Sequence, residues 1–231
     1  MENKVKRTME KHLDFTIDME TTAMTANAAV MMVAIVPWLR DNDTDPFCNE
    51  NELQPYVGYV DLRTCVVDGF DFDPATIKWW SERSKAAKEA VTEGLPEHIA
   101  DVLVTMLDYI RDTVAAYQLD SICLWSHGAD FDIAILRSLC KRYDIDIEDT
   151  VPHTSFRDCR TVILETALAC CSWCGDDIAT SPQDILRNPG KAYDIYQPLP
   201  DRYANGAAHD ALYDGIRSSW YTWQALKAMR K

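Results

Sequence analysis

The sequence predicts an α/β fold, and three observations lead to this prediction. Short apolar runs typical of buried strands come early in the chain, at residues 13–20 and 28–37. Segments with the apolar spacing of helices are interleaved with the later strands, and another such segment, 210–229, closes the chain. The length of 231 residues suits one domain. We therefore expect a single domain over residues 1–231, with a sheet flanked by helices.

The expected elements follow one another along the chain. A polar surface loop, a third strand and two helices are predicted at 41–55, 56–67, 74–92 and 97–117. The first of these helices begins at Pro74, because proline fits the first position of a helix. A buried strand and two more helices are predicted at 121–126, 131–143 and 160–171. Residues 175–206 hold four of the ten prolines and little periodicity, which predicts an irregular excursion before the last helix.

Composition and charge narrow the classes of protein. A formal net charge of −14 argues against binding nucleic acid through a basic surface, but not against acids whose bound cations hold phosphates. The charged residues 1–12 are not followed by the apolar region of a secretory signal, and no apolar run is long enough to span a membrane. The eight scattered cysteines are then expected to be reduced thiols. These features predict a cytoplasmic protein without a membrane partner.

The stretch FTIDMETT, residues 15–22, places two acids in an expected strand. Asp18 and Glu20 are two residues apart, so their side chains point to the same face of the strand. Like charges this close repel one another unless a cation lies between them. The apolar run that follows, AAVMMVAIV, makes a turn of the pair toward solvent unfavourable. The two acids therefore either cap a turn or hold a metal ion.

Two later segments carry further acids. In LWSHGADFDIAIL, Asp130 and Asp132 flank a phenylalanine where a strand gives way to a helix, and Asp130 has the alternative role of a helix N-cap. In NGAAHDALYDGI, His209 and Asp214 stand at the start of the last helix. Residues five apart on a helix lie about 140° apart at ~3.6 residues per turn. Both can face one ligand only if His209 lies on the loop before the helix.

These motifs, in this order, resemble those of the DEDDh 3′–5′ exonucleases. Asp-x-Glu on a first strand, Phe-Asp after a later strand and His-x4-Asp at a last helix occur in the sequence order of that class. The segments ATIKWWSERSKAAKEA and RDCRT are similar to phage-type 3′–5′ exodeoxyribonucleases and to related exoribonucleases. The resemblance extends from residue 13 to about residue 229. It implies a ribonuclease H-like mixed β-sheet flanked by helices.

The resemblance also implies roles for individual residues. Four acids are implied to bind two Mg²⁺ or Mn²⁺ ions, and one histidine to act as general base: Asp18, Glu20, Asp132, Asp214 and His209. Oxygen ligands suit these ions better than zinc, and two ions can clamp the attacking and leaving oxygens of a phosphoryl transfer. A neutral histidine can accept a proton at physiological pH. Asp132 is preferred to its neighbour Asp130 because it follows the phenylalanine, as the acid of the class does.

Substrate contacts follow from the same resemblance. Residues beside the first acid pair are implied to meet the terminal nucleotide: Met19, Thr21 and Thr22. The chain departs from the commoner pattern at Ala23, where many members have glycine, and at His127-Gly128, where many have asparagine.

The function implied is the release of nucleoside 5′-monophosphates from single-stranded DNA that has a free 3′ end. One alternative is the same reaction on RNA, since the choice turns on whether the site accepts a 2′-hydroxyl. Another is a non-catalytic nucleic-acid-binding module on the same fold, which would have no reason to keep all four acids and the histidine. If the chain is phage-encoded, it is expected in the cytoplasm of the host cell.

Two aromatic residues and one local ion pair are open to more than one interpretation. Trp79 and Trp80 are adjacent and cannot share one helical face, so one is expected in the core while the other is a candidate to stack on a base. Asp158 and Arg160 are expected to pair at a helix start, in preference to a phosphate contact by Arg160.

The segment ACCSWCG contains three cysteines, Cys170, Cys171 and Cys174. The last two have the spacing of half a zinc site, which would fit a zinc-stabilised binding protein. The sequence contains no second pair at such spacing, so buried thiols in a helix are the preferred interpretation.

Overall fold

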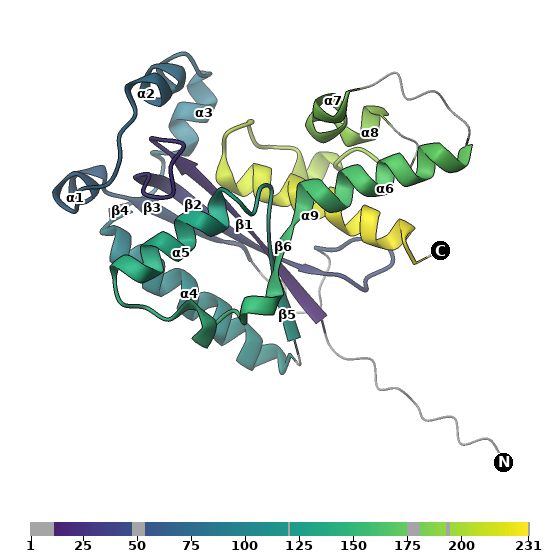
Figure 1. Ribbon diagram of the computed structural model, residues 1–231, viewed down its shortest axis with the longest axis horizontal. Coiled ribbons are helices and arrows are strands. Elements are labelled where there is room, and N and C mark those ends of the chain that lie inside the picture. Colours follow the sequence, from purple (N-terminus) through teal and green to yellow (C-terminus); the bar gives the residue numbers. More distant parts are fainter. Residues whose placement is uncertain (1–11, 48–53, 120, 175–180, 193–194, 231) are drawn as a thin grey trace.

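A computed structural model describes residues 12–47, 54–119, 121–174, 181–192 and 195–230 (Figure 1). Within these ranges one mixed sheet has the strand order β4-β3-β2-β1-β5-β6. Its strands are β1 His12–Thr21, β2 Val30–Leu39, β3 Tyr56–Val60, β4 Pro96–Glu97, β5 Ser121–Ser126 and β6 Phe156–Asp158. The β1–β2 and β2–β3 pairs are antiparallel, and the other pairs are parallel. The predicted mixed α/β architecture is confirmed.

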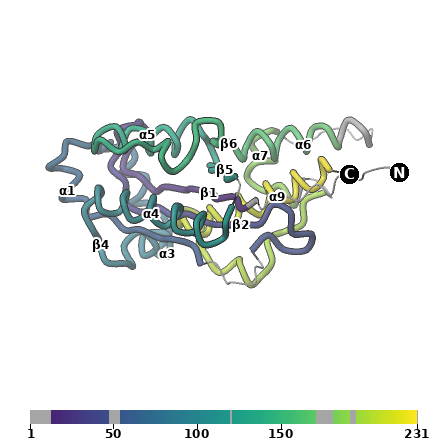
Figure 2. The backbone as a smooth tube through the Cα atoms, turned by 90° about the horizontal axis from the view of Figure 1, so that it is seen from below, coloured from purple at the N-terminus to yellow at the C-terminus, as the bar shows by residue number. Residues whose placement is uncertain are grey.

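Helices surround this sheet. The helices are α1 Leu62–Val67, α2 Pro74–Ser81, α3 Lys85–Ala90, α4 Ile99–Tyr117, α5 Asp132–Arg142, α6 Cys159–Cys174, α7 Pro182–Arg187, α8 Pro189–Ala192 and α9 Ala211–Ala228. In Figure 1, α1 to α3 lie at the upper left, α4 and α5 lie below them, and α6 to α8 lie at the upper right beside α9. Seen at right angles in Figure 2, the molecule is flat and elongated, with β1 running through its middle.

The side chains of β1 alternate between two environments. The odd-numbered residues from Leu13 to Met19 are buried in the main apolar core, which α4 and α5 complete. The even-numbered residues face α9 instead, because the Ser219 hydroxyl of that helix donates to the Thr16 hydroxyl at 2.8 Å. Successive residues of a strand point to opposite faces, so this arrangement follows from the sequence period of two. The acid pair therefore lies on the polar face of β1.

Two irregularities mark the end of β1. The pairing with β5 stops at Ile17 and Ser126, two residues before Met19. The pairing with β2 shifts register between Glu20 and Thr21, which is the mark of a β-bulge. Bulges re-aim side chains and are frequent next to active sites. β1 thus leaves its sheet partners at the point where the acids lie.

Two expected elements are shorter than predicted. The strand expected at 56–67 ends at Val60, because the Asp61 carboxylate accepts from the Arg63 amide and starts α1. The helix expected at 74–92 is divided into α2 and α3, because the Ser84 hydroxyl caps a new helix start. A local side-chain hydrogen bond ends the longer pattern in both places.

Other differences lie later in the chain. The strands β4 and β6 have 2 and 3 residues, too few for a periodic signal. The excursion expected at 175–206 contains α7, α8 and a short turn of 3-10 helix at Asp201–Tyr203 in its described part, and only the rest is irregular. The last helix, α9, lies within the expected 210–229. Cys170 is a free thiol, whereas the side chains of Cys171 and Cys174, on which the zinc interpretation depends, lie outside the described residues.

Candidate active site

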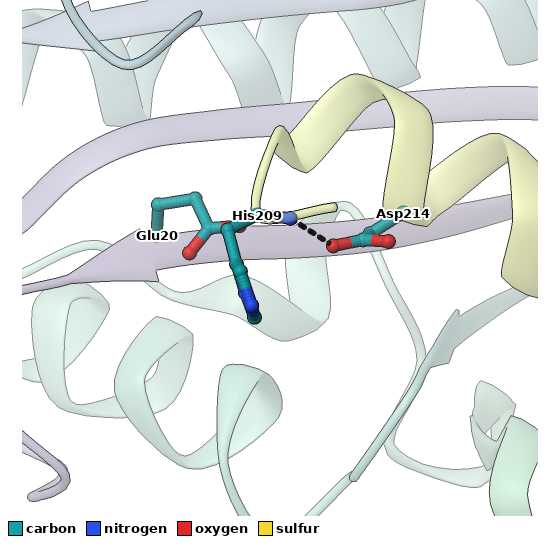
Figure 3. A group of neighbouring side chains, drawn as sticks. All are labelled: Glu20, His209 and Asp214. Atoms are coloured by element: carbon teal, nitrogen blue, oxygen red, sulfur yellow. Dashed lines mark hydrogen bonds between the residues drawn. The ribbon is translucent and has the colours of Figure 1, made fainter. Parts of the chain in front are cut away.

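Carboxylates from three separate segments meet where β1 ends. Glu20, His209 and Asp214 offer ligand atoms that all lie within 4.8 Å of one another. Figure 3 shows Glu20 at the tip of β1 and the other two residues at the start of α9. Asp18 and Asp132 complete the group, because the charges of Asp132, Glu20 and Asp214 all act on the Asp18 carboxylate. We call these five residues, Asp18, Glu20, Asp132, His209 and Asp214, the acid cluster.

Asp132 is held at the cluster by the backbone of β1. Its carboxylate accepts from the Met19 amide at 3.0 Å, which is possible because β5 no longer pairs with β1 there. It is 4% exposed and lies in the first turn of α5. Asp130 is by contrast 82% exposed at its side chain and pairs with Arg160. The geometry therefore places Asp132 in the cluster and Asp130 outside it.

His209 and Asp214 converge although they are five residues apart. His209 precedes the N-cap of α9, Asp210, and Asp214 lies in the first turn of the helix. The His209 amide donates to the Asp214 carboxylate at 2.8 Å (Figure 3). His209 has a φ of 69°, in the left-handed region that is uncommon for residues other than glycine. The position of His209 on the loop, as the sequence required, is confirmed.

Gly215 brings α9 close to the polar face of β1. A Cβ at this position would lie 3.0 Å from the Val36 side chain on β2 and 3.9 Å from the Asp18 Cβ. A larger residue would push the start of α9 away from the strands. The glycine after Asp214 therefore permits the approach of Asp214 to Asp18.

Burial and repulsion act together on the acids. Burial is the main factor that raises the pKa of Glu20 to about 8 and the pKa of Asp132 to about 7. The pKa of Asp18 is raised by burial and then by the charges of Asp132 and Glu20. Burial also raises the pKa of Asp214. Ionising all four acids together is therefore unfavourable without a nearby positive charge.

The pKa of His209 shifts in the opposite direction to the pKa values of the acids. Burial lowers the pKa of His209 below its ordinary value of 6.5, although the Asp214 carboxylate opposes this effect. Its ring lies edge-on to Trp79, with 4.6 Å between ring centroids. His209 is therefore neutral at pH 7 and able to accept a proton.

An aromatic hollow of about 470 Å³ opens on one side of the acid cluster. Its lining includes Met19, Thr21, Trp79, Trp80 and Phe131, along with Glu20 and His209. Trp80 is 8% exposed and donates from its indole to the Thr21 carbonyl at 2.9 Å, whereas Trp79 is 36% exposed. Trp80 is thus the buried member of the pair and Trp79 the accessible one.

A second hollow of about 800 Å³, the arginine hollow, is also lined by His209. Three of its lining residues, Asp18, His209 and Asp214, belong to the acid cluster. Three others are arginines from α6, α7 and α9: Arg160, Arg187 and Arg217. The cluster therefore lies between an apolar space and a polar, cationic one.

Two other residues have roles that the sequence did not predict. Thr22 is buried, and its hydroxyl donates to the carbonyls of Ala29 and Asp71 and not to the aromatic hollow. Its contact with substrate stays a prediction. Asp210 caps α9 and adds a fifth negative charge that acts on Asp18 and Glu20. An aspartate just before the apolar run of the last helix was the available signal for this cap.

The fold of this chain is similar to that of several solved nucleases. The zinc-bound complex of E. coli exonuclease I with single-stranded DNA has a TM-score of 0.57 and 15% identity, over 96% of this chain and 41% of that one. Exonuclease I with a dT13 oligonucleotide gives 0.55 and 14%, over 90% and 40%. The nuclease domain of 3′hExo, a DEDDh family member bound to rAMP, gives 0.51 and 9%, over 96% and 94%. This chain thus spans about two fifths of exonuclease I, and no curated protein matches it in sequence.

The fold is that of the class of DEDDh exonucleases, a ribonuclease H-like mixed sheet flanked by helices. Within this class, the chain belongs to the family of 3′-5′ exoribonuclease Rv2179c-like domains, whose sequence model matches residues 13–226. The description of this family names an exoribonuclease, and exoribonucleases were one of the two kinds of enzyme that the sequence resembles. Among the described helices, none is both long and apolar enough to cross a membrane.

Proposed function

We propose that this protein hydrolyses single-stranded nucleic acid from its 3′ end and releases nucleoside 5′-monophosphates. The observation that supports it most is the acid cluster itself, in which four carboxylates and a neutral histidine meet between two hollows. In this reaction water attacks the terminal phosphorus, the bond to the 3′-oxygen of the penultimate nucleotide breaks, and that oxygen takes up a proton. The products are a nucleoside 5′-monophosphate and a strand shortened by one nucleotide.

The acid cluster fits divalent cations. Its four acids, Asp18, Glu20, Asp132 and Asp214, offer carboxylate oxygens, the ligands that Mg²⁺ and Mn²⁺ prefer. The raised pKa values of Glu20 and Asp132 indicate buried carboxylates that lack sufficient counter-charge. A bound cation would favour their ionised forms. Two such ions, when bound, would offset the negative charge that builds up on the attacking and leaving oxygens.

The protein residues then have distinct roles. His209, neutral at pH 7, is the general base that takes a proton from the attacking water. The Met19 amide fixes the orientation of Asp132 by a hydrogen bond that depends on the end of β5 pairing. The amide of His209 does the same for Asp214. The backbone thus positions two of the four acids before any ligand arrives.

The aromatic hollow is the place for the terminal nucleoside. Met19 and Thr21 line it beside Glu20, as the resemblance implied, and Trp79 provides an accessible indole on which a base can stack. The Arg83 guanidinium lies 4.1 Å from the Trp79 ring centroid and helps to hold that ring.

The sugar of the substrate is open to two candidates. The sequence resemblance favours DNA, and the E. coli exonuclease I structure with a TM-score of 0.57 is described with single-stranded DNA. The family description favours RNA, which makes 3′–5′ exoribonuclease activity the second candidate. Oligonucleotides that are 5′-labelled and matched in sequence, as single-stranded DNA, duplex DNA and RNA, separate the two.

The test combines these substrates with metal and a matched variant. We expect cleavage in Mg²⁺ or Mn²⁺, none in excess EDTA, and a ladder that shortens from the 3′ end with 5′-monophosphates as products. Asp18→Ala should lose nearly all activity, whereas Asp112→Ala, at an exposed position on α4, should retain it. Full cleavage in EDTA, or by Asp18→Ala, would refute the proposal.

A further inference from the structure

The arginine hollow is not accounted for by the release of the terminal nucleotide. It shares Asp18, His209 and Asp214 with the acid cluster, but its lining includes neither Trp79 nor Trp80. Its three arginines come from three helices of a chain whose formal net charge is −14. A strongly negative protein repels a polyanion at long range, so cations concentrated beside the acid cluster point to a local contact with phosphate.

Arg187 is the arginine most available to a ligand. It is exposed at the end of α7, and within the described part of the chain its guanidinium makes no ion pair or hydrogen bond. Ion pairs of arginine with phosphate are charge-assisted and often bidentate. Among the described residues, Arg187 is therefore a cation that lines a hollow without a carboxylate partner.

Arg217 joins this region to α9. Its guanidinium donates to the carbonyl of Leu186 at 3.2 Å and to the carbonyl of Arg187. It also lies 5.5 Å from the Tyr221 ring centroid, measured from its guanidinium carbon. These contacts tie the end of α7 to the helix that carries Asp214. Packing between the end of α7 and α9 therefore fixes the position of Arg187 relative to the acid cluster.

Arg160 lies at the third wall, and Gly128 makes room for it. Gly128 has a φ of 145°, and a Cβ there would lie 2.6 Å from the Arg160 guanidinium. The predicted partner Asp158 lies 4.0 Å away, and the exposed Asp130 pairs with the same guanidinium. The departure from the commoner sequence pattern at Gly128 thus lets an arginine lie against the loop beside the cluster.

The chemistry of the reaction assigns a direction to the strand. If the terminal nucleoside occupies the aromatic hollow, the leaving 3′-oxygen and every upstream nucleotide must extend away from it. His209 lines two hollows, the aromatic hollow and the arginine hollow. The upstream strand is therefore directed to the arginine hollow.

We propose that the arginine hollow binds the sugar–phosphate backbone of the upstream strand, with Arg187 contacting a phosphate and Arg160 and Arg217 completing the cationic wall. The proposal rests on the proposed function, since it takes the terminal nucleotide as the reference point. It adds the substrate register: the nucleoside on the tryptophan side, the scissile phosphate at the acids, and the upstream phosphates on the arginine side.

The test compares a substrate that has an upstream strand with one that lacks it. The p-nitrophenyl ester of thymidine 5′-monophosphate keeps the terminal nucleoside and the scissile phosphate, and replaces the upstream strand by p-nitrophenol. Its hydrolysis is measured beside that of a labelled single-stranded octanucleotide, for wild type and Arg187→Ala. Arg63→Ala is the matched control, since its side chain is 88% exposed and pairs with Asp61 at the start of α1.

We expect Arg187→Ala to raise the KM of the octanucleotide about tenfold with little change in kcat, because one charge-assisted phosphate contact is lost. Hydrolysis of the ester should stay within about twofold of wild type, since that substrate has no phosphate for Arg187 to contact. The slope of log K against log salt for the octanucleotide should become shallower by about 0.7, the value for one phosphate of a single strand.

A binding measurement keeps this inference separate from the proposed function. Octanucleotide and nucleoside 5′-monophosphate are titrated in Ca²⁺, and only the octanucleotide should bind Arg187→Ala more weakly. An equal loss of affinity for the two ligands would place the terminal nucleotide in the arginine hollow. No loss of affinity for either ligand would show that Arg187 does not contact the strand. Either result overturns the inference. A wild type that binds the octanucleotide but cleaves neither substrate would refute the proposed function, while the binding result would still decide the register.

Discussion

The two faces of β1 differ in the partners of their side chains. On the polar face these partners also change along the strand. On the apolar face, the odd-numbered residues from Leu13 to Met19 pack into one continuous core. On the polar face, Asp14 accepts from Arg40 at 2.7 and 2.9 Å. Asp18 and Glu20 instead face other acids.

This comparison separates a structural acid from acids that await a ligand. A buried acid with an arginine partner is part of the fold, and its loss leaves an unpaired charge. Buried acids that raise one another's pKa destabilise the fold in the absence of a counter-charge, so their presence points to function. The same strand contains both kinds, four residues apart.

The largest expected effect contrasts Asp18 with Asp14. Asp18→Asn should lower the rate about 10⁴-fold, about 5.5 kcal/mol, because a metal-binding oxygen of the site loses its charge. Asp14→Asn should keep the rate within a few fold but lower the free energy of unfolding by about 3 kcal/mol, because Arg40 loses its buried partner. Single-turnover rates and urea unfolding of the two variants test the contrast. A large loss of rate in Asp14→Asn together with a large loss of stability in Asp18→Asn would contradict it.

His209→Ala is expected to slow the chemical step by ~10²–10⁴-fold, about 3–5.5 kcal/mol, as for loss of a general base. The wild-type rate should fall as pH drops through the histidine pKa, which burial lowers below 6.5, because imidazolium cannot accept a proton. Single-turnover rates from pH 5 to 9 at saturating Mn²⁺ should show this acid limb flattened in His209→Ala.

The control for this variant is His153→Ala, since that side chain is 70% exposed. It should retain both the rate and the acid limb. An unchanged acid limb in His209→Ala would assign the base to another group.

The unpaired acids should also affect stability in a pH-dependent way. The pKa of Glu20 is raised from 4.5 to about 8, mainly by burial, so its stabilising contribution is complete below pH 4.5 and is lost as pH rises through 8. In EDTA at pH 8, Glu20→Gln should therefore raise the free energy of unfolding by about 2 kcal/mol, or Tm by ~5 °C. The gain should be smaller at pH 5.

Thermal unfolding of wild type, Glu20→Gln and the exposed control Glu89→Gln measures this effect. Addition of Mn²⁺ should stabilise wild type more than Glu20→Gln at pH 8. A Glu20→Gln variant less stable than wild type in EDTA would show that Glu20 has a protein partner, as Asp14 does.

The smallest expected effect concerns the aromatic hollow. Trp79→Ala should raise KM about tenfold, since a base stacked on an aromatic ring contributes ~1–3 kcal/mol. Trp79→Phe should recover most of the loss, because the phenyl ring still offers a stacking face. Steady-state kinetics on the p-nitrophenyl ester measures both variants without the upstream strand, and a normal KM for Trp79→Ala would exclude stacking on this residue.

The parts of the site that could be predicted depend on local spacing. Asp18 and Glu20 stand out because a period of two puts both on one face of a strand. Asp132 stands out because it follows a phenylalanine, as the acid of the class does. The loop position of His209 follows from helix geometry together with the requirement that His209 and Asp214 face one ligand. The strand and helix positions that carry the site were predicted for the same reason, from apolar periods long enough to recognise.

The remaining features depend on contacts between distant segments. Nothing local shows that Trp80 is buried and Trp79 accessible, since that depends on the Thr21 carbonyl. The three arginines of the arginine hollow come from three helices, and one of these, α7, lies in the segment predicted to be irregular. Short elements such as β6 form by pairing with β5 and carry no signal of their own.

The most direct test of the central claim is calorimetric titration of Mn²⁺ into wild type, Asp14→Asn and Asp18→Asn at pH 7.5. We expect two ions to be bound by wild type and by Asp14→Asn, because the arginine-paired acid takes no part in binding. In Asp18→Asn at least one ion should be lost or bound more than tenfold more weakly. Binding by Asp18→Asn that equals wild type in number and affinity would contradict the claim that the unpaired acids of β1 hold the cations.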